Sequence, residues 1–208
     1  MDITSLFDKP KIIGVAADVN SGKSMLLYHI VETLRAKAEF NLYTFGLRVP
    51  VKDSKQIFSV EELEEVENSI IMIDETFTLF DLDNRKNKKA VENTLRLINH
   101  NNNILILCMV PENVKKFIAA KLDTIIFKKC TIPDFINGSM VKRVVDSYSG
   151  YEKGTALLGL KINEALVFDG KHYHKIDVPY YPKYDTKSTN KSILAPKKKG
   201  AKNGTKRD

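Results

Sequence analysis

The segment at residues 17–24 has the residue types and order of a phosphate-binding loop. It reads Ala17-Asp18-Val19-Asn20-Ser21-Gly22-Lys23-Ser24 and follows the β-branched apolar run Ile12–Ala16, which predicts a buried strand. From Ser24 to about Ala38, apolar residues recur at the spacing of one helix face. A strand, a tight loop and a helix start are the setting in which a Gly-Lys-Ser sequence binds the phosphates of a nucleotide.

Each part of this loop has an expected role. Successive backbone N–H groups would surround a β-phosphate, and the positive end of the helix dipole adds to the attraction. Lys23 would contact the β- and γ-phosphates of ATP, and the Ser24 hydroxyl would be a ligand of Mg²⁺. We expect nucleotide contacts from nine residues: Ala17, Asp18, Val19, Asn20, Ser21, Gly22, Lys23, Ser24 and Met25.

The first position of the loop departs from the usual G-x-x-x-x-G-K-[ST] pattern, because Ala17 stands where a glycine is expected. An alanine fits there as long as its φ stays negative. Asn20 stands where many such loops have a further glycine, and asparagine tolerates the left-handed backbone better than most residues. The alternative is an ordinary capped helix after a glycine turn.

Two adjacent acids, Asp74 and Glu75, end the apolar run Ile70–Ile73. Successive side chains at a strand end point to opposite sides, so the two carboxylates can have different roles. Asp74 would hold Mg²⁺ directly or through water, and Glu75 would orient and polarise the water that attacks the γ-phosphate. Taken alone, the pair fits a charged turn better, but its combination with Gly22-Lys23-Ser24 favours a hydrolase.

Short apolar runs alternate with helical periodicity over most of the chain, which predicts an α/β fold. We expect a P-loop NTPase of the RecA-like (ASCE) type, with a mostly parallel sheet flanked by helices and an antiparallel β edge near the C-terminus. Ligands of such sheets bind at the carboxyl ends of the strands. The expected strands are 12–16, 40–47, 70–73, 104–110, 124–127, 156–162, 165–168 and 172–176, with a tight hairpin turn at 169–170. The expected helices are 24–38, 59–67, 88–99, 111–121 and 133–148.

The 208-residue chain has a formal net charge of +7, and this charge is concentrated near its end. Residues 183–208 hold nine of the 33 basic and two of the 26 acidic residues, so residues 1–182 are formally neutral. This last segment has few apolar residues, which predicts a disordered basic tail after an ATPase domain of residues 1–182. Such a tail either binds a polyanion such as nucleic acid or only keeps the protein soluble.

The sequence also argues against several protein classes. No apolar run approaches the roughly 18 residues of a membrane span, and the first residues lack the pattern of a secretory signal. Cys108 and Cys130 lie in apolar segments and are expected to be buried, reduced thiols. We therefore expect no stable membrane insertion and a cytoplasmic location.

The order of elements after the acid pair resembles that of the FtsK–HerA superfamily of DNA-pumping ATPases. A helix, the very apolar run Ile104–Val110, a helix that starts at Pro111 and a short strand over Asp123–Phe127 follow one another. The resemblance covers residues 10–176, and the small size is similar to that of genome-packaging ATPases of tailless, membrane-containing viruses.

This resemblance implies a homo-oligomeric ring, usually a hexamer, that threads double-stranded DNA and holds ATP between neighbouring subunits. It also implies a capsid or portal-vertex protein as a partner, and a place in the host cytoplasm or at the packaging vertex of a virion. The residues that carry over by position are Lys23, Ser24, Asp74 and Glu75.

Two features of the family are incomplete here. The polar sensor of the family, often a glutamine, is missing from Cys108-Met109-Val110, which leaves Asn113 as a candidate. The resemblance also implies an arginine that a neighbouring subunit supplies to stabilise the transition state, and the candidates are Arg85 and Arg143. Arg85 lies in the basic segment 81–89, which either faces DNA or is simply solvated.

Other functions remain open at this stage. A nucleoside or nucleotide kinase shares the phosphate loop, but it needs an arginine-rich lid, and residues 1–182 contain only five scattered arginines. A phage assembly or export ATPase would normally bring a membrane anchor, and the sequence does not separate viral packaging from plasmid transfer. His172 and His174 are expected to be exposed strand residues, because two histidines do not make a metal site without further ligands.

Overall fold

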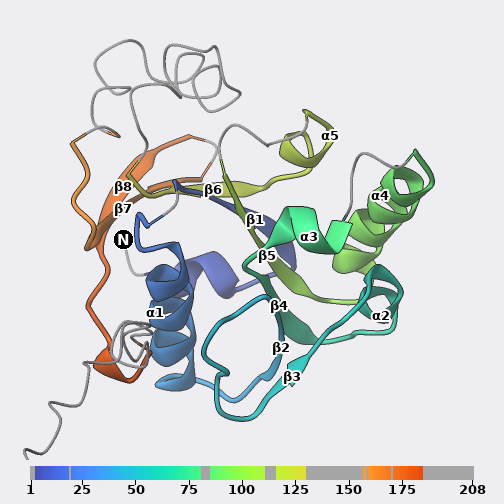
Figure 1. Cartoon of the computed structure of the whole chain (residues 1–208), viewed down its shortest axis with the longest axis horizontal. Coiled ribbons are helices and arrows are strands. Elements are labelled where there is room, and N and C mark those ends of the chain that lie inside the picture. Colours follow the sequence, from blue (N-terminus) through green and yellow to red (C-terminus); the bar gives the residue numbers. More distant parts are fainter. Residues whose placement is uncertain are drawn as a thin grey trace, which may run out of the picture.

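A computed structural model of the chain describes residues 3–18, 20–80, 85–110, 116–129, 157, 159–169 and 171–184. Within these residues, eight strands form one sheet in the order β3-β2-β4-β5-β1-β6-β7-β8 (Figure 1). From β3 to β6 the neighbours pair in parallel, and β7 and β8 add an antiparallel edge. The strands are β1 (Lys11–Ala16), β2 (Asn41–Phe45), β3 (Ser54–Gln56), β4 (Ser69–Ile73), β5 (Ile104–Met109), β6 (Thr124–Phe127), β7 (Glu164–Phe168) and β8 (Tyr173–Asp177). The expected fold class is confirmed.

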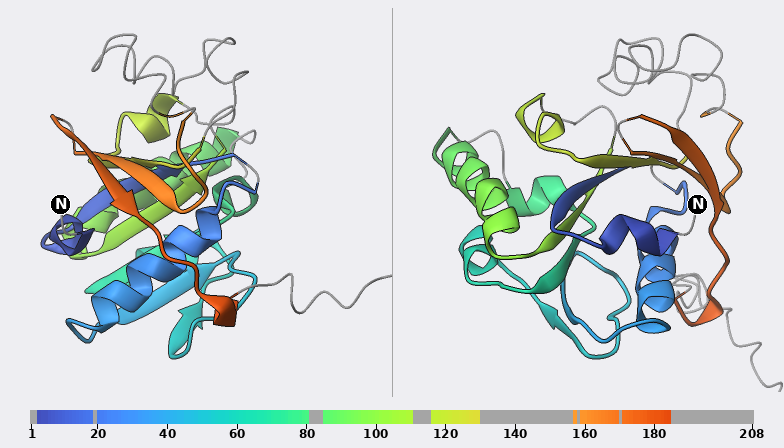
Figure 2. Two further views of the ribbon diagram at one scale, coloured as in Figure 1. Left: turned by 90° about the vertical axis from the view of Figure 1, so that its left-hand side faces the viewer. Right: turned by 180° about the vertical axis from the view of Figure 1, so that it is seen from behind.

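Alternation along the central strands sends side chains into two cores, one on each face of the sheet. In β4, Ile70 and Met72 pack in the core that also contains the apolar residues of α1 (Lys23–Arg35). Ile71 and Ile73 pack in the opposite core, with α2 (Val60–Glu64), α3 (Thr76–Phe80) and α4 (Arg85–His100). Figure 2 shows α1 and α4 on opposite sides of the sheet. Because both faces are covered, β1, β4 and β5 are buried along their whole length.

Several element boundaries differ from the sequence-based expectation. The polar segment 48–58 contains the short edge strand β3, and α4 begins at Arg85 instead of Lys88. The expected strand 156–162 is wrong in its described part, because residues 157 and 159–162 carry no strand assignment. The helix expected from Pro111 is described only as α5 (Lys116–Ala119), and the helix expected over 133–148 lies outside the described residues.

The chain after β8 packs along α1 and ends in the 3-10 helix η3 (Pro182–Tyr184). The Tyr184 ring stacks on Tyr28 with 3.9 Å between the ring centroids, and its hydroxyl donates to Glu32 at 2.6 Å. Lys183 forms an ion pair with the same carboxylate at 2.9 Å. Lys183 and Tyr184, which the sequence analysis assigned to the basic tail, thus pack on α1.

Candidate active site

The loop between β1 and α1 contains two residues with left-handed backbone, as a tight turn into a helix needs. Gly22 has φ +86° and Asn20 has φ +63°, so the asparagine adopts the left-handed conformation expected of it. Ala17 does not have positive φ, and its N–H donates to the Met109 carbonyl of the neighbouring β5 at 3.1 Å. An alanine at the first position is thus compatible with the loop. Val19 lies outside the described residues.

The fold brings Ser24 and Asp74 into direct contact, although they are 50 residues apart in sequence. Ser24 lies in the first turn of α1, and Asp74 follows β4 directly. The Ser24 hydroxyl donates to Asp74 Oδ2 at 2.7 Å. Lys23 starts the same helix, where the helix dipole attracts anions. The two halves of the site expected from the sequence therefore meet at the carboxyl ends of the strands.

Asp74 is buried without enough partners for its charge. Its side chain is 7% exposed, and its Oδ1 atom has no hydrogen-bond partner. Burial raises the pKa of Asp74, while the Ser24 hydrogen bond and the charge of Lys23 act against this shift. A hydroxyl next to a carboxylate that has one free oxygen can bind a divalent cation, and such a cation can also bind nucleotide phosphates. Ser24 and Asp74 are thus suitable ligands for Mg²⁺.

Cys108, near the end of β5, follows Leu107, which pairs with Ile73, the residue before Asp74. It is fully buried and unpaired, as expected, and burial raises its pKa well above that of an ordinary thiol. Its nearby thiol makes the smallest of the contributions that lower the pKa of Asp74. The strand end at which the resemblance implies a polar sensor thus carries a thiol. Asn113, Cys130 and Arg143 lie outside the described residues.

Glu75 differs from its neighbour in being exposed to solvent. Its carbonyl accepts the N–H groups of Thr78 and Leu79, so it starts α3. Gly46, at the end of β2, has φ +76°, and a Cβ there would lie 3.1 Å from the Glu75 backbone nitrogen. The positive φ of Gly46 and its close approach to Glu75 therefore favour glycine at this position. The contact holds the backbone of Glu75 in place, while its carboxylate faces solvent.

Lys128 is a residue of this site that the sequence reasoning missed. It follows β6 directly, is fully buried, and donates to the carbonyls of Ile162 at 2.6 Å and Glu164 at 2.8 Å. Burial lowers the pKa of Lys128 to about 8. A Cβ on Gly22 would lie 3.0 Å from the Ile162 carbonyl oxygen. Lys128 therefore holds the turn at 159–163 against the phosphate loop.

The structure places only part of the remaining expected site. Met25 is half-buried, and its sulfur accepts the Tyr181 N–H at 3.4 Å, so it contacts the C-terminal segment. Arg85 is the first residue of α4, and its side chain lies outside the description. Lys88, on the same helix, contacts Glu92 at 3.9 Å and lies over the Phe117 ring. In the part of the chain that the structure describes, no helix is long and apolar enough to span a membrane.

Comparison with known proteins supports this fold. No protein-family profile matches the sequence, and no curated protein matches it either. Among solved structures, the genome packaging NTPase B204 from Sulfolobus turreted icosahedral virus 2 in complex with ATP-gammaS is similar, with a TM-score of 0.63 and 16% identity over 83% of this chain and 100% of that chain. The pCW3 conjugation coupling protein TcpA has a TM-score of 0.59 and 14% identity over 88% of this chain and 63% of that chain. The cytoplasmic domain of EssC has a TM-score of 0.52 and 11% identity over 81% and 38% of the two chains. The expected resemblance to FtsK–HerA-type ATPases is confirmed as a likeness of fold.

Proposed function

We propose that this chain is an ATP-hydrolysing DNA translocase that packages double-stranded viral DNA into a capsid. The observation that carries the proposal is the 2.7 Å contact between Ser24 and Asp74, beside the Gly22-Lys23 turn and the exposed Glu75. One carboxylate is buried with a free oxygen, and the next faces solvent. This difference suits one acid for a metal and the other for a water molecule.

The residues of the site divide the chemistry between them. The loop N–H groups and Lys23 would bind the β- and γ-phosphates, while Ser24 and Asp74 would hold Mg²⁺, which neutralises charge on the phosphate oxygens. Glu75 would accept a hydrogen bond from water and orient it toward the γ-phosphorus. Attack breaks the bond to the β-phosphate oxygen and releases ADP and phosphate. Arg85 or Arg143 of a neighbouring subunit in a hexameric ring would stabilise the transition state.

The DNA part of the proposal rests on the similar structures and on charge. Packaging and conjugation coupling are named functions of two proteins that share the fold. The chain beyond Tyr184 retains eight of the nine basic residues of the C-terminal segment, because only Lys183 belongs to the folded domain. Lysines that neutralise phosphates release counterions, so their contribution weakens as salt rises.

Phosphate release with and without double-stranded DNA tests the proposal. Wild-type protein should hydrolyse ATP, and DNA should stimulate it. Lys23→Ala should lose nucleotide binding or turnover, while Glu75→Gln should bind ATP and hydrolyse it very slowly. Normal turnover by Glu75→Gln would refute the assigned role of this residue in activating water.

Two further measurements separate translocation from other functions. A chain that lacks residues 185–208 should bind DNA with a shallower salt dependence and keep its basal hydrolysis. Sizing with a non-hydrolysable nucleotide should show a ring-sized assembly. A monomer that transfers phosphate to a small acceptor would instead identify a nucleoside or nucleotide kinase.

A further inference from the structure

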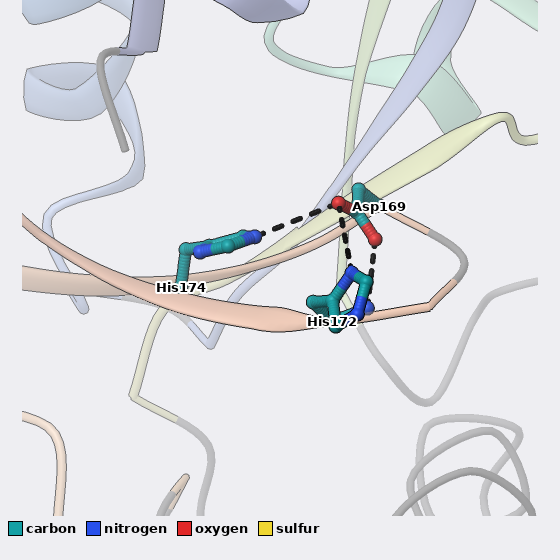
Figure 3. Close-up of side chains that lie close together, drawn as sticks. All are labelled: Asp169, His172 and His174. Atoms are coloured by element: carbon teal, nitrogen blue, oxygen red, sulfur yellow. Dashed lines mark hydrogen bonds and ion pairs between the residues drawn. The ribbon is translucent and has the colours of Figure 1, made fainter.

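Three metal-ligating side chains converge at the turn between β7 and β8 (Figure 3). Asp169 Oδ2 lies 3.5 Å from His174 Nε2 and 3.9 Å from His172 Nδ1. One ligand atom from each of the three residues lies within 4.8 Å of the other two. The sequence predicted the two histidines as exposed strand residues without a further ligand, and the fold supplies the missing carboxylate.

The turn holds Asp169 so that one carboxylate oxygen stays available. Oδ1 accepts the backbone N–H groups of Lys171 at 2.9 Å and His172 at 2.8 Å. Oδ2 is left to face the two imidazole rings, as Figure 3 shows.

The strand register fixes the two histidines on the same side. His174 lies in β8 opposite Val167 of β7, and His172 is two residues earlier, just before the strand. Residues two apart on an extended chain point to the same side. The Tyr173 side chain, between them, packs on Phe168 with 4.7 Å between the ring centroids. The hairpin therefore presents both imidazoles to one carboxylate and anchors the intervening residue.

The two distances to Asp169 are close to what a tetrahedral metal ion needs. Bonds of about 2.0–2.1 Å to zinc place neighbouring ligand atoms about 3.3 Å apart. The observed separations of 3.5 and 3.9 Å are slightly longer, and the nitrogen atoms of the two histidines lie within 4.8 Å of each other. Two imidazoles and one carboxylate form a ligand set of open zinc sites, in which water or a donor from another molecule takes the fourth position. We propose that Asp169, His172 and His174 bind one Zn²⁺ ion.

This site is separate from the expected nucleotide site. Phe168, next to Asp169, pairs with Ile125 near the start of β6, whereas the phosphate loop lies where β1 ends. Because β1 and β6 are parallel, the zinc site lies at the amino ends of these strands and the phosphate loop lies at their carboxyl ends. A zinc ion here would not replace the Mg²⁺ of the nucleotide. It would instead join the two strands of the outer hairpin and leave a coordination position open to solvent at the edge of the sheet.

Isothermal titration of the full chain with zinc chloride, without nucleotide, tests this proposal. We expect saturable binding of one Zn²⁺ per chain. His174→Ala removes a ligand, and Asp169→Asn keeps the Oδ1 acceptor for the turn but removes the second carboxylate oxygen. Each should weaken binding by about tenfold or more, since changes even to the outer shell of a zinc site cost that much.

A matched control uses another histidine of the chain, which contains four. His100 is exposed in the last turn of α4, and His100→Ala should bind zinc as the wild type does. Cobalt(II) offers a second readout, because a tetrahedral site gives an intense visible absorption that both cluster variants should lose. Absent binding, equal affinity in all variants, or equal loss in His100→Ala would overturn the proposal. None of these results depends on ATP hydrolysis.

Discussion

Replacing Asp74 with asparagine should stabilise the nucleotide-free protein and abolish its response to Mg²⁺. The carboxylate is buried, one of its oxygens has no partner, and its pKa is raised by burial. Removing the charge therefore relieves a desolvation cost. An incompletely paired buried polar group costs about 1–3 kcal/mol, and charged groups cost more. Because the amide of asparagine also lacks one partner, we expect a net gain of about 1 kcal/mol.

For a chain of this size, 1 kcal/mol corresponds to a melting temperature about 2–4 °C higher. The sign of the pH dependence follows from the raised pKa of Asp74. The folded state holds this proton more tightly than the unfolded chain, so wild-type stability falls as pH rises through the interval between the two pKa values. The advantage of Asp74→Asn should therefore shrink as pH falls through this interval and vanish below about pH 4, the pKa of an ordinary aspartate.

Thermal melts with and without ATP-gammaS and Mg²⁺ measure both effects. The wild type should gain stability when nucleotide and Mg²⁺ are added together, and Asp74→Asn should lose the part that depends on Mg²⁺. Glu75→Gln is the matched control, because it removes an adjacent but exposed charge and should leave the nucleotide-free melting temperature unchanged. A lower melting temperature for nucleotide-free Asp74→Asn, or an intact response to Mg²⁺, would contradict the role assigned to this carboxylate.

Three further predictions follow from contacts around the site. Tyr184→Ala should lower the free energy of unfolding by about 3–5 kcal/mol in urea titrations, the usual cost of truncating a buried aromatic ring, whereas deleting residues 185–208 should not change it. Gly22→Ala forces a Cβ into a backbone with φ +86°, which costs about 1–2 kcal/mol, and it should weaken ATP-gammaS binding in fluorescence titrations; unchanged affinity would argue against the loop conformation. Because the pKa of Lys128 is lowered to about 8, the unfolded chain binds more protons than the folded one between that value and the ordinary lysine pKa, so this residue's contribution to stability rises with pH. The urea midpoint of the wild type should therefore rise relative to that of Lys128→Met as the pH is raised from 7 to about 10. A difference between the two midpoints that does not change with pH would contradict the lowered pKa.

The sequence was sufficient to predict the central sheet because its strands are buried on both faces. Runs such as Ile70–Ile73 and Ile104–Met109 have no polar face. Because segments with helical periodicity separate them, such runs predict buried strands of a parallel sheet. The phosphate loop and the acid pair were equally visible, since each combines a strand end with a specific residue type. Their contact could be expected from parallel topology, although the 2.7 Å distance between Ser24 and Asp74 could not.

The features that were missed depend on tertiary contacts without a local pattern. β3 is polar and exists because its backbone pairs with β2. Leu157 and Leu160 are buried without belonging to a strand, so their apolar character suggested a strand that the described residues do not form. Lys128 reads as a surface lysine until the carbonyls of residues 162 and 164 surround its amine. Nothing near Tyr184 in sequence indicates that it stacks on Tyr28.

The C-terminal segment and the start of the phosphate loop's helix are joined through α1. Its first turn carries Lys23, and Tyr28 and Glu32 receive Tyr184 about 8–14 Å further along the axis, at 1.5 Å per residue. Tension on the chain beyond Tyr184 would thus act on the helix that carries Lys23. Under the proposed function, pulling on residue 208 in a force experiment should change nucleotide release only while this anchor is intact, because α1 would transmit load between bound DNA and the nucleotide.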